Sequence, residues 1–443
     1  MTALCGLFYG SNKMATDVDV QYFSHLNGLT LGNNWGDLIR LLDKALVTGI
    51  NFTQITAASI DTQGDVHITL YAAHNAMLFQ VVELSGFTPN SLNQKYRIKG
   101  VPNTTQLILK PALDIAERSI TAIGTGKLVS LGYEIIFRDP EDVKRVYRAK
   151  NPSAQHPFIR VDESLASDTG TYTSTYAKSA MVGLLEHMDH IDDYENPNVL
   201  QLPFDPANPS KNWKIIGTGS SVVKGWSRWY WRRSGEPRAN VADSIVPSSG
   251  NAQFTLVGDF NAFYFMRNFV ANGYNKILSG CGLFDGSLPD DLIPNWFLMA
   301  YSIADPATSY LNMQTHAYAT PLIHAQPFGT TETYSKFLLP SYNITNKYTA
   351  SLDAVGVLPS LQSGYSGIYS SNILSALEVP IVDSAKYLRG TLKHICFDGN
   401  NTGARAHTTP LLSENSMYVR DTGIEASGGN TATGFYFYIG ELE

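Results

Sequence analysis

Short runs in which apolar and polar residues alternate are the feature that most limits how this 443-residue chain can fold. Four such runs lie at residues 66–70, 78–84, 96–101 and 106–109. Turn-forming residues separate them at roughly ten-residue intervals, and a period of two places alternate side chains on opposite faces of a strand. The pattern predicts a small antiparallel barrel or sandwich over residues 52–118.

Runs of the same kind continue beyond this module and predict a larger β-sandwich with long loops over residues 119–304. Its predicted strands are 133–137, 146–148, 158–161, 225–233, 254–257 and 262–266, with a helix predicted between 176 and 190. An N-terminal segment, 1–51, precedes both modules, and a Tyr-, Ser- and Asn-rich β region, 305–443, follows them. The predicted fold is therefore mainly β, with several antiparallel sandwich or barrel modules, a short N-terminal helix and a few other short helices.

The N-terminal segment contains one clear amphipathic helix, predicted over residues 36–47. Its apolar stripe consists of Leu38, Leu41, Leu42 and Leu46, spaced three and four residues apart. Asn34 or Asp37 is the predicted N-cap, and Gly49 is the predicted stop signal. A helix of about three turns is too short to be stable alone. We therefore expect it to dock on its own β-module or on a neighbouring subunit, and its four leucines are candidate assembly residues.

The charge content favours a protein that works inside an assembly. Charged residues make up 16% of the chain, well below the roughly 25% of typical soluble domains, so much of the surface must be uncharged. A net charge of −7 without a run of five like charges gives no basis for a nucleic-acid partner. Neither a signal peptide nor a stretch of about 18 apolar residues occurs in the sequence, so we expect no membrane partner.

Metal and cofactor sites are not predicted. Cys5, Cys281 and Cys396 are odd in number and far apart, which fits neither a disulfide framework nor a zinc site. Residues 186–195 contain His and carboxylate side chains three and four apart, but they match neither a zinc-protease helix nor an EF-hand. The segment is interpreted as a solvated helix end.

Catalytic motifs are not predicted either. Residues 124–127 and 217–220 resemble phosphate loops, but Leu128 follows the lysine of the first and the second lacks a third glycine, so both are interpreted as turns. No Gly-x-Ser-x-Gly elbow occurs, and no cysteine lies in a recognisable nucleophile motif. We expect the chain not to be an enzyme.

Residues 226–233 interleave tryptophans with arginines, a composition that a stacking platform for sugars or single strands would use. Strand alternation favours a structural role, because it places Trp229, Trp231 and Arg233 on one face and Arg228, Tyr230 and Arg232 on the other. Trp229 and Trp231 are therefore predicted to lie in the core or at a subunit interface.

The order of segments resembles a group of virion structural proteins of tailed bacteriophages. The segments that carry the resemblance are 33–38, 47–49, 81–86, 92–98, 132–137, 146–148, 158–163, 258–265 and 388–392. The resemblance implies a structural protein without catalytic residues, assembled in the bacterial host cytoplasm into the virion. Its implied partners are other virion proteins and copies of itself. The last hundred-odd residues match the group poorly.

Four hypotheses of function remain open. The first is a tail or baseplate structural subunit in several copies, and the second is a capsid or collar decoration protein. The third is a carbohydrate-binding host-attachment protein whose Tyr- and Trp-rich loops stack on a host surface glycan. A polysaccharide-degrading enzyme is the fourth.

Overall fold

The fold is mainly β, as the alternation predicts, in a computed structural model that describes most of the chain. It describes residues 16–443 except 154, 168–169, 172–175, 206, 217–222, 226, 236–242, 271–275, 288–293, 303–334, 341–351, 357–373, 375, 384–386, 399–407 and 426–431. In this part of the chain every pair of strands is antiparallel.

The helical elements are short. They are the α-helix α1 (Asp37–Leu42), the π-helix η2 (Asp43–Thr48) and the 3-10 helices η1 (His25–Asn27), η3 (Asn90–Leu92) and η4 (Pro209–Trp213).

Strands of the first half of the chain are β1 (Gln21–Ser24), β2 (Ile50–Asn51), β3 (Ile55–Ile60), β4 (Val66–Leu70), β5 (Val81–Ser85), β6 (Lys95–Asn103), β7 (Gln106–Pro111), β8 (Thr125–Leu128), β9 (Tyr133–Arg138), β10 (Lys144–Ala149), β11 (Phe158–Asp162), β12 (Ala166–Ser167), β13 (Gly170–Thr171), β14 (Lys178–Leu185), β15 (Gln201–Leu202), β16 (Ile215–Ile216) and β17 (Val223–Lys224). Strands of the second half are β18 (Ser227–Arg232), β19 (Phe254–Gly258), β20 (Ala262–Asn268), β21 (Lys276–Leu283), β22 (Asp285–Gly286), β23 (Trp296–Ser302), β24 (Ser335–Leu339), β25 (Leu352–Gly356), β26 (Ala376–Asp383), β27 (Leu388–Asp398), β28 (Thr409–Ser413), β29 (Ser416–Glu425) and β30 (Ala432–Glu441). Each strand that the sequence predicts overlaps one of these. The division of the chain at residues 51, 118 and 304 stays a prediction.

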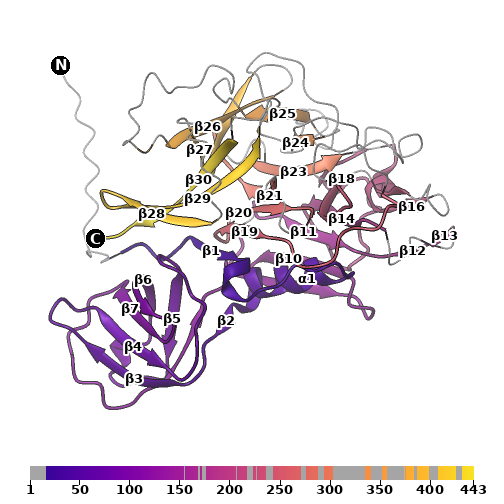
Figure 1. The fold of residues 1–443 in the computed structure, drawn as a ribbon. Helices are drawn as coiled ribbons and strands as arrows, with labels where there is room; N and C mark the ends of the chain where they lie inside the picture. Colours follow the sequence, from indigo (N-terminus) through magenta and orange to yellow (C-terminus); the bar gives the residue numbers. More distant parts are fainter. Residues whose placement is uncertain are drawn as a thin grey trace, which may run out of the picture.

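A separate small sheet forms the lower part of the molecule in Figure 1. Its seven strands lie in the order β2-β8-β5-β6-β7-β4-β3. The interpretation of residues 124–127 as a turn is wrong, because residues 125–127 pair with β5 as part of β8. Gly124 precedes this strand where a Cβ would overlap the carbonyl oxygen of Ser85, so close approach of two backbones explains the glycine. The segment 217–220 lies outside the described residues.

Five strands of the large sheet are covered on both faces. β1, β19, β20, β21 and β23 pair in that order. Along β20, Phe263 and Phe265 point into one hydrophobic core while Tyr264 and Met266 point into a second. The first core also includes α1 and the small sheet, and the second includes the C-terminal strands. Because both faces are covered, apolar residues follow one another along β20 and β23 without alternating with polar ones.

Two further groups of strands extend this sheet. On one side β23 pairs with β18, and the pairing continues through β14, β11 and β10 to β9. On the other it continues through β24, β25, β26, β27, β30 and β29 to β28. These C-terminal strands, orange to yellow in Figure 1, lie above the small sheet.

The helix predicted between residues 176 and 190 is wrong, because its described centre is the strand β14. All eight residues of β14 are buried, so its sequence shows no alternation. A continuous apolar run of this length fits a helix or a doubly covered strand equally well. Pairing with β11 and β18 decides for the strand.

The predicted N-terminal helix is present, although it is α-helical only as far as Leu42 and continues as the π-helix η2. Gly49 follows it with a φ of 71°, as predicted for the stop signal. The predicted caps are wrong, because the N-cap position is Gly36 and the cap itself comes from Glu163. This buried carboxylate accepts hydrogen bonds from the backbone N–H groups of Gly36 and of Ile39, the latter at 2.8 Å.

Candidate functional site

Two adjoining cavities lie beside the turn between β19 and β20, and the first of them lies where the small sheet meets the large one. The first, of about 530 Å³, is lined by residues of β5, β6 and β8 on one side and by residues near β1 and β9 on the other. The second, of about 430 Å³, is lined by Asn151, Ser153, Gln155, His156, residues 260–261 and 283–286, Asn295 and Lys393. Asn151 and Phe260 line both cavities, so the two adjoin at these residues and together make up one site. We call it the Phe260 groove.

Phe260 lies at the tip of the tight turn between β19 and β20, and 41% of its surface is exposed. The turn is held by Asp259, whose Oδ1 accepts hydrogen bonds from the backbone N–H groups of Asn261 at 2.8 Å and Ala262 at 3.0 Å. Next to it, Gly258 approaches the carbonyl oxygen of Ala262 so closely that a Cβ would overlap it. A large aromatic ring is thus held partly in solvent by a rigid turn.

A network of polar side chains packs against this turn. Asn261 donates from Nδ2 to Asp259 Oδ2 at 3.0 Å, and its Oδ1 lies 3.1 Å from His156 Nε2. The ring of His156 packs against that of Phe260, with centroids 5.8 Å apart. His394 Nε2 lies 3.2 Å from Asp259 Oδ2. Burial would raise the pKa of Asp259, but the His394 imidazole and the turn N–H groups outweigh it and lower this pKa to about 2. The Asp259 carboxylate therefore stays charged and keeps the turn in place.

A serine and a histidine meet in the groove, but their geometry is that of a turn. Ser153 Oγ lies 2.8 Å from His156 Nδ1, and the backbone N–H of Ser153 donates to the same nitrogen at 2.9 Å. The lone pair of Nδ1 is therefore already used by the backbone. Burial lowers the pKa of His156, which keeps the ring neutral. A neutral amide, Asn261, faces the other ring nitrogen, where a hydrolase triad of the Ser-His-Asp type has a carboxylate.

The groove is balanced in charge. Asp19, Glu83 and Glu134 line the first cavity together with Lys95, Lys127 and Lys150. Asp285 and Lys393 line the second. Four of these residues form two ion pairs, Lys127 with Glu83 at 3.0 Å and Lys393 with Asp285 at 2.7 Å. Such a lining favours neither anionic nor cationic ligands.

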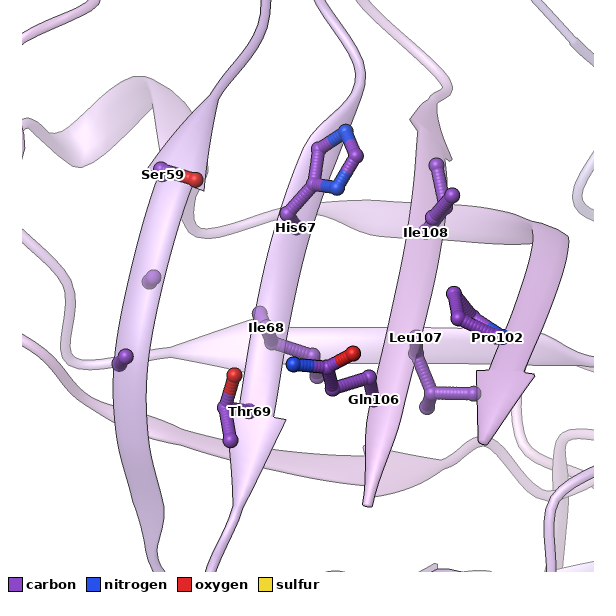
Figure 2. Close-up of a pocket in the computed structure, with 10 residues that line it drawn as sticks. Ser59, His67, Ile68, Thr69, Pro102, Gln106, Leu107 and Ile108 are labelled. Atoms are coloured by element: carbon purple, nitrogen blue, oxygen red, sulfur yellow. The ribbon is translucent and has the colours of Figure 1, made fainter. Parts of the chain in front are cut away.

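Another cavity, of about 290 Å³, is lined by residues of β3, β4, β6 and β7 of the small sheet (Figure 2). His67, Thr69 and Gln106 line it from the neighbouring strands β4 and β7. His67 Nε2 lies 3.0 Å from Asp61 Oδ2, and this contact lowers the pKa of Asp61. The rest of the lining is Ser59 together with Ala, Ile, Leu and Pro residues. A single imidazole beside a turn carboxylate gives this site less ligand-recognising chemistry than the Phe260 groove.

The six residues that the sequence marks as candidate assembly contacts are all buried within the fold of this chain. Leu38, Leu41, Leu42, Leu46, Trp229 and Trp231 are at most 2% exposed and belong to the first core. Their packing partners in the structure are residues of the same chain, so any effect on assembly would act through the fold. The subunit contact itself stays a prediction.

The two tryptophans occupy specific positions in this core. Trp229 donates from Nε1 to the carbonyl oxygen of Met299 at 2.9 Å and meets Phe263 edge to face. Trp231 meets Trp35 edge to face, with centroids 5.8 Å apart. The other face of β18 is also buried, and there Tyr230 donates to Asp243 Oδ2 at 2.7 Å. The strand therefore offers no exposed stacking platform in its described residues. Trp226 lies outside them.

Residues 186–195 form turns and bends, so their His and carboxylate side chains do not share a helix face. The interpretation as a helix end is therefore wrong, although the segment is solvated at His187 and Asp189. Among the described residues no group of three or more His, Cys, Asp or Glu is placed to hold a metal ion. Cys281 and Cys396 are free thiols. Cys5 lies outside the described residues, and within these no helix is long and apolar enough to cross a membrane.

The sequence reasoning missed Phe260, His156 and Asn261. The stretch Gly258 to Ala262 joins two predicted strands, and an aromatic residue at the tip of so short a turn cannot be buried by its own hairpin. That signal could have marked Phe260. His156 and Asn261 are 105 residues apart in sequence and meet only through the fold.

Comparison with known proteins places the chain in no family. No protein-family model matches it, and no curated protein matches its sequence. Among solved structures it matches the phage phi92 endosialidase at 8% sequence identity and a TM-score of 0.13. The match covers 96% of this chain and 52% of the other, so the chain spans about half the length of that protein. At this TM-score the match does not establish a shared fold.

Proposed function

We propose that the chain is a non-enzymatic structural subunit of a tailed-phage particle, located in the tail or baseplate. In this proposal it is present in several copies, is assembled in the bacterial host cytoplasm, and acts through contacts with copies of itself and with other virion proteins. The resemblance of its segment order to such proteins and its low content of charged residues support the proposal.

The observation that carries the proposal is the presence of exposed pairs of large apolar side chains. Ile245 and Val246 are 51% and 60% exposed, and Tyr387 and Leu388 are 70% and 57% exposed. Single exposed apolar residues are ordinary, whereas neighbouring ones form patches of the kind that mark protein contacts. A subunit whose faces are covered by neighbours would bury these pairs.

The oligomeric state of the purified chain tests this proposal. We expect light scattering during gel filtration to show a multimer. The double change Tyr387→Ser with Leu388→Ser should reduce the mass of this multimer without lowering the Tm of the chain. Tyr71→Ser, at an isolated side chain that is 78% exposed, is the matched control. A wild-type chain that stays monomeric at every concentration would contradict self-assembly.

Mass spectrometry of purified particles tests the location. We expect the chain in intact virions at a copy number that matches tail or baseplate symmetry. A copy number close to that of the major capsid subunit would instead support a capsid decoration protein. Absence of the chain from particles would overturn the proposed function.

A further inference from the structure

We propose that the Phe260 groove binds a stretch of neutral polysaccharide, with the ring of Phe260 stacked against the apolar face of one sugar unit. This goes beyond the proposed function, because it assigns a ligand to the subunit wherever the subunit lies in the particle.

The size and shape of the groove fit an extended ligand. Its two parts, of about 530 Å³ and about 430 Å³, each lie in the range of roughly 300–1,000 Å³ in which proteins hold small ligands. Because Asn151 and Phe260 line both parts, a ligand long enough to reach both would contact these two residues. A ligand with several similar units uses such a groove better than a single compact molecule does.

Phe260 supplies the apolar contact that sugar recognition needs. A pyranose ring presents C–H groups on its faces, and these pack on the face of an aromatic ring. The Phe260 ring is 41% exposed, yet the Asp259 turn and the His156 ring hold it in place. A ring that is already held loses little conformational freedom on binding, so more of the contact energy remains for affinity.

The rest of the lining supplies hydrogen bonds of both kinds. Asn151 and Gln155 carry amide groups, each with donors and an acceptor, and Asp285 and Lys393 add a charged acceptor and a charged donor. Sugar hydroxyls both donate and accept, so they match such a mixed lining. A peptide would need apolar pockets for its side chains or a free strand edge for its backbone. The lining of the second cavity is mostly polar, so this part of the groove favours a glycan over a peptide.

The balance of charge decides which glycans fit. The groove is lined by four acidic and four basic side chains, three of each in the first cavity and one of each in the second. A polysaccharide that carries a carboxylate or phosphate on every repeat would meet the acidic groups as often as the basic ones. Uncharged hexose chains avoid this repulsion, so they are the ligand class that we infer.

Binding of the full chain to an array of bacterial surface oligosaccharides tests the inference. The array carries neutral hexose-containing repeats and, as a separate arm, repeats that contain uronic acid or phosphate. We expect retention on neutral repeats. Phe260→Ala should weaken binding by about tenfold or more, since ring stacking is worth about 1.4 kcal/mol, while Phe260→Tyr should keep it. The Tm of Phe260→Ala should stay close to that of the wild type.

A second variant keeps the test decisive if Phe260→Ala folds poorly. Asn151→Ala changes an exposed side chain that lines both cavities, and we expect it to weaken binding as well. Tyr71→Ala, on the small sheet outside the groove, is the control that should bind normally. The inference is overturned if the wild type binds no neutral repeat, if it prefers the charged arm, or if Phe260→Ala breaks the oligomer and leaves glycan binding intact. Failure of glycan binding would leave the virion-subunit proposal standing, because the oligomer and particle measurements test that proposal separately.

Discussion

Lys276 and Asp421 form an ion pair in which neither side chain has any exposed surface. Lys276 Nζ lies 2.7 Å from both carboxylate oxygens of Asp421. The pair joins the first residue of β21 to the middle of β29, 145 residues away in sequence. Two buried charges are tolerated only when each neutralises the other, so this contact ties the C-terminal strands to the large sheet.

Removal of one partner should therefore be costly. We expect Asp421→Ala to lower the free energy of unfolding by about 3–5 kcal/mol, because it leaves the Lys276 ammonium buried without its counter-ion. Urea denaturation followed by tryptophan fluorescence measures the change. Asp189→Ala, in the exposed pair with His187, is the control and should leave the midpoint where it is. Equal midpoints for both variants would show that the Lys276 contact does not hold these strands.

Trp231 should be needed for the stability of the chain. Its side chain is fully buried against Trp35, and truncation of a buried Trp to Ala typically costs about 3–5 kcal/mol. We expect Trp231→Ala to unfold at much lower urea concentration or to fail to accumulate in soluble form. Tyr71→Ala, at a side chain that is 78% exposed, should unfold like the wild type. A stable Trp231→Ala chain that had lost only glycan binding would favour a ligand-binding role for this tryptophan.

Glu163 should make stability depend on pH. Burial raises the pKa of this carboxyl from 4.5 to about 7, although hydrogen bonds from Ile39 and Gly36 favour its charged form. Lys224 lies close enough to lower this pKa and Asp37 close enough to raise it. Between about pH 4.5 and about pH 7 the folded chain holds a proton that the unfolded chain has lost, so the contribution of Glu163 to stability falls as the pH rises.

The variant Glu163→Gln isolates this contribution, since it cannot titrate. We expect the Tm of the wild type to fall more steeply than that of Glu163→Gln across this pH window, as measured by differential scanning calorimetry. Other titrating groups affect both chains equally and cancel in the comparison. Glu195→Gln changes an exposed glutamate and should follow the wild-type curve. Parallel curves for wild type and Glu163→Gln would show that Glu163 titrates normally.

A chelator should leave the fold unchanged. The carboxylate of Asp192, in the segment 186–195, already contacts Arg160 at 2.6 Å and Lys144 at 3.0 Å, so its charge is neutralised by protein groups. Removal of a structural metal normally destabilises its fold. We therefore expect the same Tm with and without EDTA. A fall of several degrees that a divalent ion reverses would establish a metal site in this protein.

The positions of most strands followed from local pattern. Where one face of a strand is covered, as at Val66–Leu70 and Gln106–Pro111, alternation marks the strand and turn residues mark its ends. The leucine stripe of α1 likewise identified its buried face, because the spacing of residues on a helix is set by the backbone. These are properties of neighbouring residues, so the sequence alone determined them.

Tertiary structure decided what depends on distant partners. β14 is a strand because β11 and β18 pair with it, whereas its buried, non-alternating sequence fits a helix as well. The cap of α1 is Glu163, which accepts a hydrogen bond from the backbone N–H of Ile39. The two residues are 124 positions apart in sequence. The Phe260 groove depends on His156, Asn261 and the small sheet coming together from separate segments. Local pattern carries no information about such pairs, because the fold brings them together only when distant elements bury their apolar faces against one another.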